Sequence, residues 1–443
     1  MMLRIDPRDF ISPPYVRCPK CGEDSLGVLS IGPRHYQRRC KNCLYPGRGD
    51  WSAIYPLPAL TKRIIYVDQF AISNMMKALN PSTKAHKKGN LDPFWLTLFQ
   101  HLDSLCKLQL AVCPRSGFHR NESLLSAYYE PLKQMYELLS GGVRFREHES
   151  IEISEICEHA MNWARGKPKE KISLPVRVAL EGNLDGWTDT IGVSIRGGWG
   201  IDWVDRLRED RKRVCERLNG VVEMWKEDKD KDFQDWFTQE CSGYGRLILR
   251  GYNDYLVRLA DMWQGRIPAT ADDLFGAFAF SSSVVRSLRF TFQNAGFKPK
   301  RVQQLWVEYL QSASFEDVPF VRISAMLFAA VARKFARGGR RKPVNEGLVT
   351  DINIISVLMP YCDAAFIDNE CEAYLREKPL CELLDYKTKV FSLNTRADFL
   401  EYLAEIRRSA TKEHLEKVEE VYGPDAQKPY TTLYEGIQSE SSK

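Results

Sequence analysis

The sequence has no apolar run long enough to span a membrane. Runs such as 275–280 and 325–332 are much shorter than the roughly 18 residues that a spanning helix needs. The first residues, MMLRIDPRDF, also lack the apolar core of a signal peptide. We therefore expect a cytoplasmic protein without a membrane partner, and its length allows roughly two or three domains.

The sequence also has little net charge, because 63 Lys and Arg stand against 58 Asp and Glu, or +5 overall. This excludes a chain that attracts polyanions through its overall charge, so any affinity for nucleic acid must come from local patches. One such patch is the segment Arg333–Lys342, RKFARGGRRK, which has cations and no acid. The residues expected to touch a polyanion there are Arg337, Arg340, Arg341 and Lys342.

The twelve cysteines do not have the spacing of a secreted disulfide framework. Most stand singly among apolar neighbours, as in a reducing cytosol. The others form two Cys-x-x-Cys pairs, and each pair can hold one side of a tetrahedral zinc ion. We expect a structural zinc ribbon in residues 1–58, with the ligands Cys18, Cys21, Cys40 and Cys43.

The expected ribbon also carries a mixture of cations and rings. These side chains are Arg34, His35, Tyr36, Arg38, Arg39 and Lys41. Such a mixture suits contact with a single-stranded nucleic acid, for which Arg38, Arg39 and Lys41 are the candidate cations. A folding module that docks on the main domain explains the segment equally well, so both interpretations stay open.

Residues 59–130 alternate between strand-like and helix-like patterns. Arg63–Asp68 is a β-branched strand that ends in a carboxylate, and Leu108–Cys113 is a second apolar strand. Between and beside them the sequence predicts helices at 69–79 and 95–107 and a basic loop at 84–88. Glu122 lies on the helix after the second strand, and a lone histidine such as His119 is more often structural than functional.

Residues 131–334 have few strand-like runs and are dominated by helical periodicity. We expect a helical insertion of domain size, which offers a surface for a protein partner. The second part of the α/β domain then occupies 335–426, and the polar residues 427–443 are expected to form a flexible tail.

The segment Thr350–Glu370, TDINIISVLMPYCDAAFIDNE, organises this second part. Thr350 is a good N-cap, which would place Asp351 in the first turn of a buried helix that Pro360 ends. Ala364–Ile367 follows as a buried parallel strand with Asp368 at its end. A last strand at 390–393 leads to Asn394, and Thr395 is expected to cap a helix over 397–408.

Four acids therefore lie close to the ends of predicted strands or the beginnings of predicted helices. Strand C-termini and helix N-termini share the ligand-binding edge of a parallel sheet, so the acids should converge. They are Asp68, Glu122, Asp351 and Asp368. Clustered carboxylates repel each other unless a cation neutralises them, and hard oxygen ligands select Mg²⁺ or Mn²⁺. Asn394 should lie on the same edge and contact the nucleic acid.

This pattern, over residues 59–130 and 343–410, resembles the PIN domain family of metal-dependent nucleases. The matching motifs are YVDQF, HRNES, TDINII and AFIDNE. The resemblance implies a parallel sheet flanked by helices, here split by the helical insertion, with Asp68, Glu122, Asp351 and Asp368 as catalytic metal ligands. Many members have Ser or Thr two residues after the first acid, where this chain has Phe70.

Some assignments have alternatives. Glu130 could replace Glu122, and Asp363 or Glu370 could share the role of Asp368. The leading expectation is an endoribonuclease in which metal-activated water cleaves single-stranded RNA, since zinc ribbons also occur in PIN proteins that handle RNA. A nuclease acting on single-stranded or flap DNA, and an inert scaffold that binds protein partners, are the alternatives.

Overall fold

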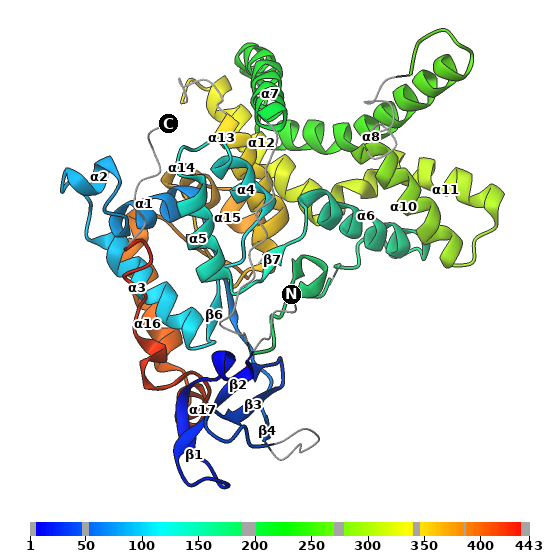
Figure 1. The fold of residues 1–443 in the computed structure, drawn as a ribbon. Coiled ribbons are helices and arrows are strands. Elements are labelled where there is room, and N and C mark those ends of the chain that lie inside the picture. The colour runs from blue at the N-terminus through cyan, green and yellow to red at the C-terminus, as the bar shows by residue number, and fades with distance from the viewer. Residues whose placement is uncertain are drawn as a thin grey trace.

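A computed structural model describes residues 6–46, 53–172, 174–187, 201–269, 279–339, 346–384 and 387–435. It is a mixed α/β structure with a small antiparallel sheet, a parallel sheet and a long helical region. Figure 1 shows the antiparallel sheet at one end of the molecule and the helical region at the other. The antiparallel sheet lies near the N-terminus and has the strand order β1-β2-β3-β4. These strands are β1 Ser12–Arg17, β2 Asp24–Ile31, β3 His35–Cys40 and β4 Ile54–Pro56.

The second sheet has the order β10-β9-β5-β6, and each of its pairings is parallel. Its strands are β5 Arg63–Val67, β6 Ala111–Val112, β9 Ala364–Phe366 and β10 Lys389–Phe391. The parallel sheet predicted from the strand pattern is thus confirmed. Strand β6 is shorter than predicted because Gln109 has a φ of 59°, a turn conformation that delays the extended chain until Ala111.

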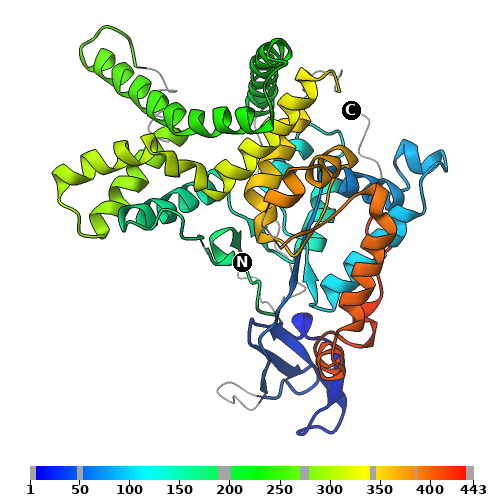
Figure 2. The same cartoon turned by 180° about the vertical axis from the view of Figure 1, so that it is seen from behind.

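Side chains of β5 alternate between two cores, as the period of a strand requires. Ile65 and Val67 face a core built with helices α1, α3, α5 and α16, whereas Ile64 and Tyr66 face the core of the helical region. The first set of helices is α1 Gln69–Leu79, α3 Phe94–Lys107, α5 Tyr129–Ser140 and α16 Arg396–Arg408. Figure 2 shows β5 running between these two groups.

The helical region packs directly on the sheet, because one continuous core joins Ile64 and Tyr66 to its helices. Its main helices are α6 His148–Ala164, α7 Ile201–Glu227, α8 Phe233–Trp263, α10 Phe280–Asn294, α11 Pro299–Gln311 and α12 Pro319–Ala336. A short antiparallel pair of strands, β7 Arg144–Phe145 and β8 Leu180–Glu181, flanks α6 in the sequence. The expected insertion is therefore mainly helical, and it covers one face of the sheet.

The helix that carries Asp351 begins earlier than the sequence suggested. Helix α13 covers Glu346–Asn353, continues as a π-helical turn over Ile354–Leu358, and ends in a 3₁₀ turn at Met359–Tyr361. Thr350 is therefore inside the helix, so its prediction as N-cap was wrong, and Asp351 is not in the first turn. A residue that is suited to cap a helix does not exclude a helix that begins further upstream, when the preceding residues can also adopt helical structure.

Three smaller predictions were wrong in whole or in part. Residues 84–87 form a short helix, α2 Lys84–Lys87, since the Thr83 side chain accepts a hydrogen bond from the His86 N–H and caps it. Thr395 is the N-cap residue of α16, as predicted, but its side chain makes no capping hydrogen bond to that helix. The expected flexible tail is mostly exposed over 427–435, but it is anchored by Tyr434, which is buried and donates a hydrogen bond to the Pro131 carbonyl.

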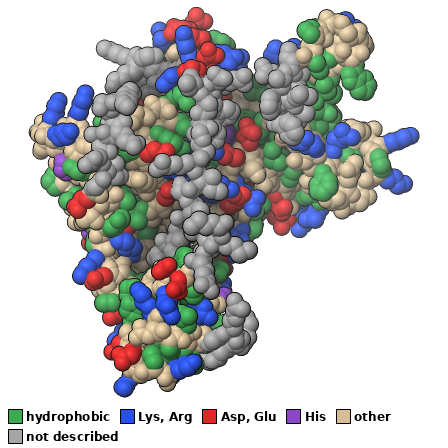
Figure 3. Space-filling view, viewed as in Figure 1, with side chains coloured by type: hydrophobic (Ala, Val, Ile, Leu, Met, Phe, Trp, Pro, Cys, Tyr) green, Lys and Arg blue, Asp and Glu red, His purple; other side chains and the backbone are tan. Residues whose placement is uncertain are grey.

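Further elements are the 3₁₀ turn Pro7–Phe10, α4 Gly117–Ser123, α14 Asn369–Arg376, α15 Leu380–Leu383 and α17 Lys412–Tyr422. No helix in the described part of the chain is long and apolar enough to cross a membrane. Lys and Arg side chains occupy several separate places on the face in Figure 3, in agreement with the small net charge.

Candidate functional site

The four cysteines of the N-terminal sheet form a cluster that could hold a metal ion such as zinc. Two loops of the ribbon bring them together, and their sulfur atoms all lie within 4.8 Å of one another. The Cys18–Cys43 and Cys21–Cys40 sulfur distances are both 3.7 Å. Zinc–sulfur bonds of about 2.3 Å in a tetrahedron place sulfurs about 3.8 Å apart, so the spacing fits zinc.

The surroundings of Cys40 favour its thiolate form. Burial opposes ionisation, but hydrogen bonds led by the Cys43 backbone N–H outweigh it and lower the pKa of Cys40 to about 6. The Ser25 hydroxyl lies 3.0 Å from the same sulfur. A deprotonated sulfur is what a zinc ion requires.

The structure corrects the expected role of Arg38. This side chain is only 4% exposed, and its guanidinium donates hydrogen bonds to the carbonyls of Pro14, Leu26 and Glu420 at 2.7, 3.0 and 2.7 Å. Glu420 belongs to α17, so Arg38 fastens the ribbon to the C-terminal helix. A buried, satisfied guanidinium cannot pair with a nucleic acid.

The other side chains of the expected nucleic-acid face differ in exposure. Tyr36 is fully buried and donates a hydrogen bond to Glu420. Arg39 is half-buried and donates to the Pro46 carbonyl at 3.3 Å, whereas Lys41 is exposed. The ribbon therefore contacts the rest of the protein through part of the aromatic and basic face that the sequence predicted to bind a nucleic acid.

Two of the predicted acids follow neighbouring strands. In the β5–β9 pairing Val67 lies opposite Phe366, so Asp68 and Asp368 come just after adjacent strand ends. Asp68 is the N-cap of α1, where its side chain accepts a hydrogen bond from the Gln69 N–H. Asp368 is the N-cap of α14 and accepts from the Cys371 N–H. Both caps direct a carboxylate toward the same sheet edge.

Asp351 reaches that edge from α13. Asp68, Asp351 and Asp368 line one cavity of about 10 Å³, roughly the space of a single water molecule. Carboxylate oxygens of Asp351 and Asp368 lie within 4.8 Å of each other and of the Cys371 sulfur, a spacing that allows a shared metal ion. The π-helical turn that follows Asp351 supplies Ile354 and Ile355 to the same cavity, and such turns are frequent at functional sites.

The acids strongly affect one another's ionisation. Burial, followed by the charge of Glu122, raises the pKa of Asp68 to about 7. Burial, followed by the charges of Asp68 and Asp368, raises the pKa of Asp351 to about 9. The cluster therefore retains protons near neutral pH when nothing positive lies among the carboxylates.

Glu122, on the helix that follows the second strand, influences these aspartates. It lies on α4, and its charge contributes to the raised pKa values of both Asp68 and Asp351. Glu130 is an exposed residue in the first turn of α5, and it is not among the main charges that raise the pKa values of these aspartates. These charge effects favour Glu122 over its alternative.

Asp363, Glu370 and Asn394 take different positions. Asp363 precedes β9 at the opposite edge, where it accepts a hydrogen bond from the Ile64 N–H and pairs with Arg63 at 3.0 Å. It therefore cannot share the role of Asp368. Glu370 is exposed in the first turn of α14, and the exposed Asn394 follows β10 at the same end as Asp368.

The basic segment after the helical region is described only in part. Arg337 is the exposed C-cap residue of α12. Arg340, Arg341 and Lys342 lie outside the described residues.

Two residues of the acid site were missed in the sequence. Tyr66 is fully buried and lines the acid cavity, and its hydroxyl has no hydrogen-bond partner among the described residues. Cys371, three residues after Asp368, contributes the third potential ligand atom. The sequence contained a signal for both. Tyr66 lies two places before Asp68 in a strand and so shares its face, and Cys371 is at the third position of the helix that Asp368 caps.

His119 has the structural role that a lone histidine suggests. Its ring lies between those of Tyr66 and Tyr136, with centroid distances of 5.0 and 4.7 Å. Burial lowers its pKa to about 3, so the ring is neutral at physiological pH. Its Nδ1 accepts a hydrogen bond from the Ser116 N–H and holds the start of α4.

Comparison of this chain with protein-family models, curated proteins and solved structures found no match. The resemblance to PIN domains accordingly depends on the residues and geometry of this chain alone.

Proposed function

We propose that this chain is a PIN-like, metal-dependent endoribonuclease that cleaves single-stranded RNA. The observation that carries the proposal is the convergence of Asp68, Asp351 and Asp368, from three separate segments, around one small cavity. Acids that serve only as caps do not need to meet, and their mutual repulsion raises the cost of folding. A cation would remove that cost, which makes a metal site a better explanation than coincidence.

The side chains have distinct parts in this proposal. Asp68, Asp351 and Asp368, with Glu122 beside them, would hold Mg²⁺ or Mn²⁺ through carboxylate oxygens. Such an ion activates water and neutralises the charge of a phosphodiester under attack. Tyr66 lines the same cavity, and its hydroxyl would donate a hydrogen bond to an oxygen held there.

RNA contact is proposed for a set of cations and for the exposed Asn394. The proposed contacts are Arg39, Lys41, Arg337, Arg340, Arg341, Lys342 and Asn394. The four ribbon cysteines would hold a structural zinc, and the helical region would offer a surface to a protein partner.

Incubation of the purified protein with labelled single-stranded RNA and DNA, with and without Mn²⁺, tests the proposal. We expect Mn²⁺-dependent cleavage of RNA that Asp68→Asn abolishes while the variant stays folded. Asp363→Asn is the matched control, because this acid also adjoins a strand but lies at the opposite edge. Cleavage of DNA alone would favour the DNA nuclease, and no metal-dependent cleavage of either would favour the scaffold.

A further inference from the structure

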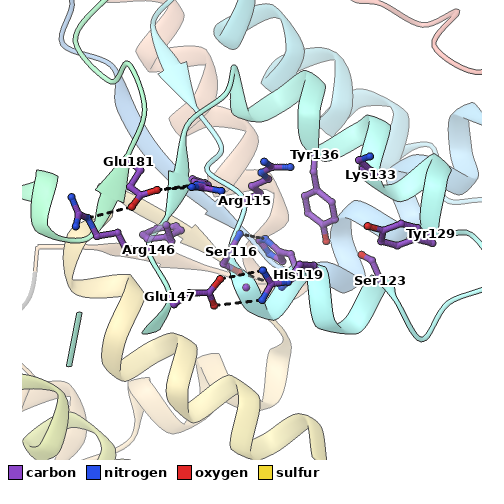
Figure 4. Close-up of a pocket in the computed structure, with 14 residues that line it drawn as sticks. Arg115, Ser116, His119, Ser123, Tyr129, Lys133, Tyr136, Arg146, Glu147 and Glu181 are labelled. Carbon is purple, nitrogen blue, oxygen red and sulfur yellow. Dashed lines mark hydrogen bonds and ion pairs between the residues drawn. The ribbon is translucent and has the colours of Figure 1, made fainter. Parts of the chain in front are cut away.

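A large basic cavity lies beside the acid site. It has a volume of about 570 Å³, within the range of about 300–1,000 Å³ in which proteins bind small molecules or single groups of larger ones. Its walls come from α4, α5 and the antiparallel β7–β8 pair, segments that are separate in the sequence (Figure 4). The cations that line it are Arg115, Arg120, Lys133, Arg144 and Arg146, and the acids are Glu147 and Glu181.

The two acids leave Arg115 without a counter-charge. Glu147 pairs with Arg120 at 3.1 Å, and Glu181 pairs with Arg144 at 2.8 Å and with Arg146 at 3.9 Å. Arg115 has no ion pair within the described ranges, although its backbone bridges directly to that of Arg144. Arg115 therefore adds a positive charge next to the Arg144–Glu181 ion pair, and it is the cation of this wall that an anionic ligand can pair with.

A buried hydroxyl on the cavity wall also lacks a hydrogen-bond partner of normal geometry among the described residues. Tyr136 is only 6% exposed, and its hydroxyl lies near Ser123 but forms no hydrogen bond of normal geometry there. In Figure 4 the Arg115 side chain lies between the Glu181 ion pairs and the Tyr136 ring, with Lys133 and Tyr129 further along. A hydroxyl and a guanidinium that lack partners on one wall suit a phosphate oxygen.

The acid site and the basic cavity share a wall. Tyr66 lines the acid cavity, whereas His119 and Tyr136 line the basic cavity, and the three rings stack in that order. Helix α4 similarly presents Ser123 to the basic cavity and carries Glu122 next to it. A strand whose phosphodiester lies at the acids thus has a neighbouring nucleotide close to Arg115.

We propose that this basic cavity holds a phosphate-bearing nucleotide of the substrate strand adjacent to the scissile bond. Arg115, assisted by Lys133, contacts the phosphate, and the Tyr136 hydroxyl donates a hydrogen bond to it. The half-buried Tyr129 ring offers a stacking surface to the base. This assignment rests on the proposed nuclease function and identifies where the enzyme holds the strand.

Binding measurements test the proposal without requiring cleavage. The Asp68→Asn protein, without added Mg²⁺ or Mn²⁺, is titrated with short oligouridylates that carry either a 5′-phosphate or a 5′-hydroxyl. Arg115→Ala in this background should weaken binding about tenfold. It should also make the slope of log K against log salt shallower by about 0.7, since about one phosphate contact is lost. Arg250→Ala, which removes an exposed cation of α8, should change neither quantity.

Comparison of the two oligonucleotides shows whether the cavity binds a terminal or an internal phosphate. If the cavity holds a terminal phosphate, the 5′-phosphorylated strand binds more tightly and Arg115→Ala removes the difference. If it holds an internal phosphate, both strands bind equally and both lose affinity. Arg115→Lys should fall between the parent and Arg115→Ala, because it keeps the charge but loses the two-pronged geometry.

Two results would overturn the proposal. One is a folded Arg115→Ala variant with unchanged affinity for both strands. The other is Arg115-dependent binding of uridine monophosphate or inorganic phosphate without any Arg115-dependent binding of the strands. The proposed catalytic function fails separately: a strand that binds through Arg115 but is never cleaved with Mn²⁺ would remove the nuclease and keep the cavity assignment.

Discussion

Asparagine in place of Asp68 should stabilise the metal-free protein at alkaline pH. Asn keeps an oxygen that accepts the hydrogen bond from the Gln69 N–H, but it removes the charge that opposes ionisation of Asp351. Asp68 has a pKa raised from 3.8 to about 7. At about 1.4 kcal/mol per pKa unit the full shift corresponds to about 4 kcal/mol. Because the Asp68 side chain is partly exposed, solvent screens part of this repulsion, and we expect Asp68→Asn to raise the free energy of unfolding by about 1–2 kcal/mol.

The sign of this effect depends on pH. A carboxyl whose pKa is raised on folding binds more protons in the native state, so stability falls as pH rises from the unfolded pKa toward the folded one. The unfolded value is 3.8, and the folded pKa values are about 7 for Asp68 and about 9 for Asp351. The gain from Asp68→Asn should therefore be present near pH 8 and small near pH 4.

Urea unfolding without a chelator measures this effect while leaving the cysteine cluster undisturbed. Mg²⁺ should stabilise the parent more at the higher pH, where it no longer competes with protons, and should stabilise Asp68→Asn much less. Asp363→Asn serves as the control and should give no gain at either pH, since Asp363 pairs with Arg63. An equal change in unfolding free energy at both pH values, or a loss at the higher pH, would refute the carboxylate-repulsion argument.

Three further predictions concern the ribbon and the acid cavity. The purified chain should contain one zinc by elemental analysis, and Cys40→Ser should release it and destabilise the ribbon; zinc-free native protein would contradict this. Arg38→Ala should cost about 2–4 kcal/mol in urea unfolding, because three buried carbonyls lose their donor, whereas Lys41→Ala should be neutral. Tyr66→Phe should leave the free energy of unfolding unchanged or slightly higher, since the lost hydroxyl has no partner in the described chain. The same variant should lower the cleavage rate and leave substrate affinity intact. A clear loss of stability would contradict this, because it would show that the hydroxyl has a partner.

The sequence alone determined the features that depend on short-range spacing. The two Cys-x-x-Cys pairs indicated the metal cluster because each knuckle is local, and only the closing of a hairpin was needed to join them. The apolar runs ending at Asp68 and Asp368 indicated parallel strands, and strand direction then placed both acids at one edge. These inferences needed no knowledge of which distant segments touch.

Only the tertiary structure decided features that depend on distant contacts. Arg38 looks like a surface cation in its own segment, and it is buried because α17, far away in the chain, supplies the carbonyl of Glu420. The tail looked loose because its polar residues conceal one aromatic anchor, Tyr434, whose site on α5 is not visible locally. The basic cavity around Arg115 likewise exists only because α4, α5 and the β7–β8 strand pair meet. Local sequence sets how a segment is shaped, but burial and charge compensation belong to pairs of segments, and no single segment encodes them.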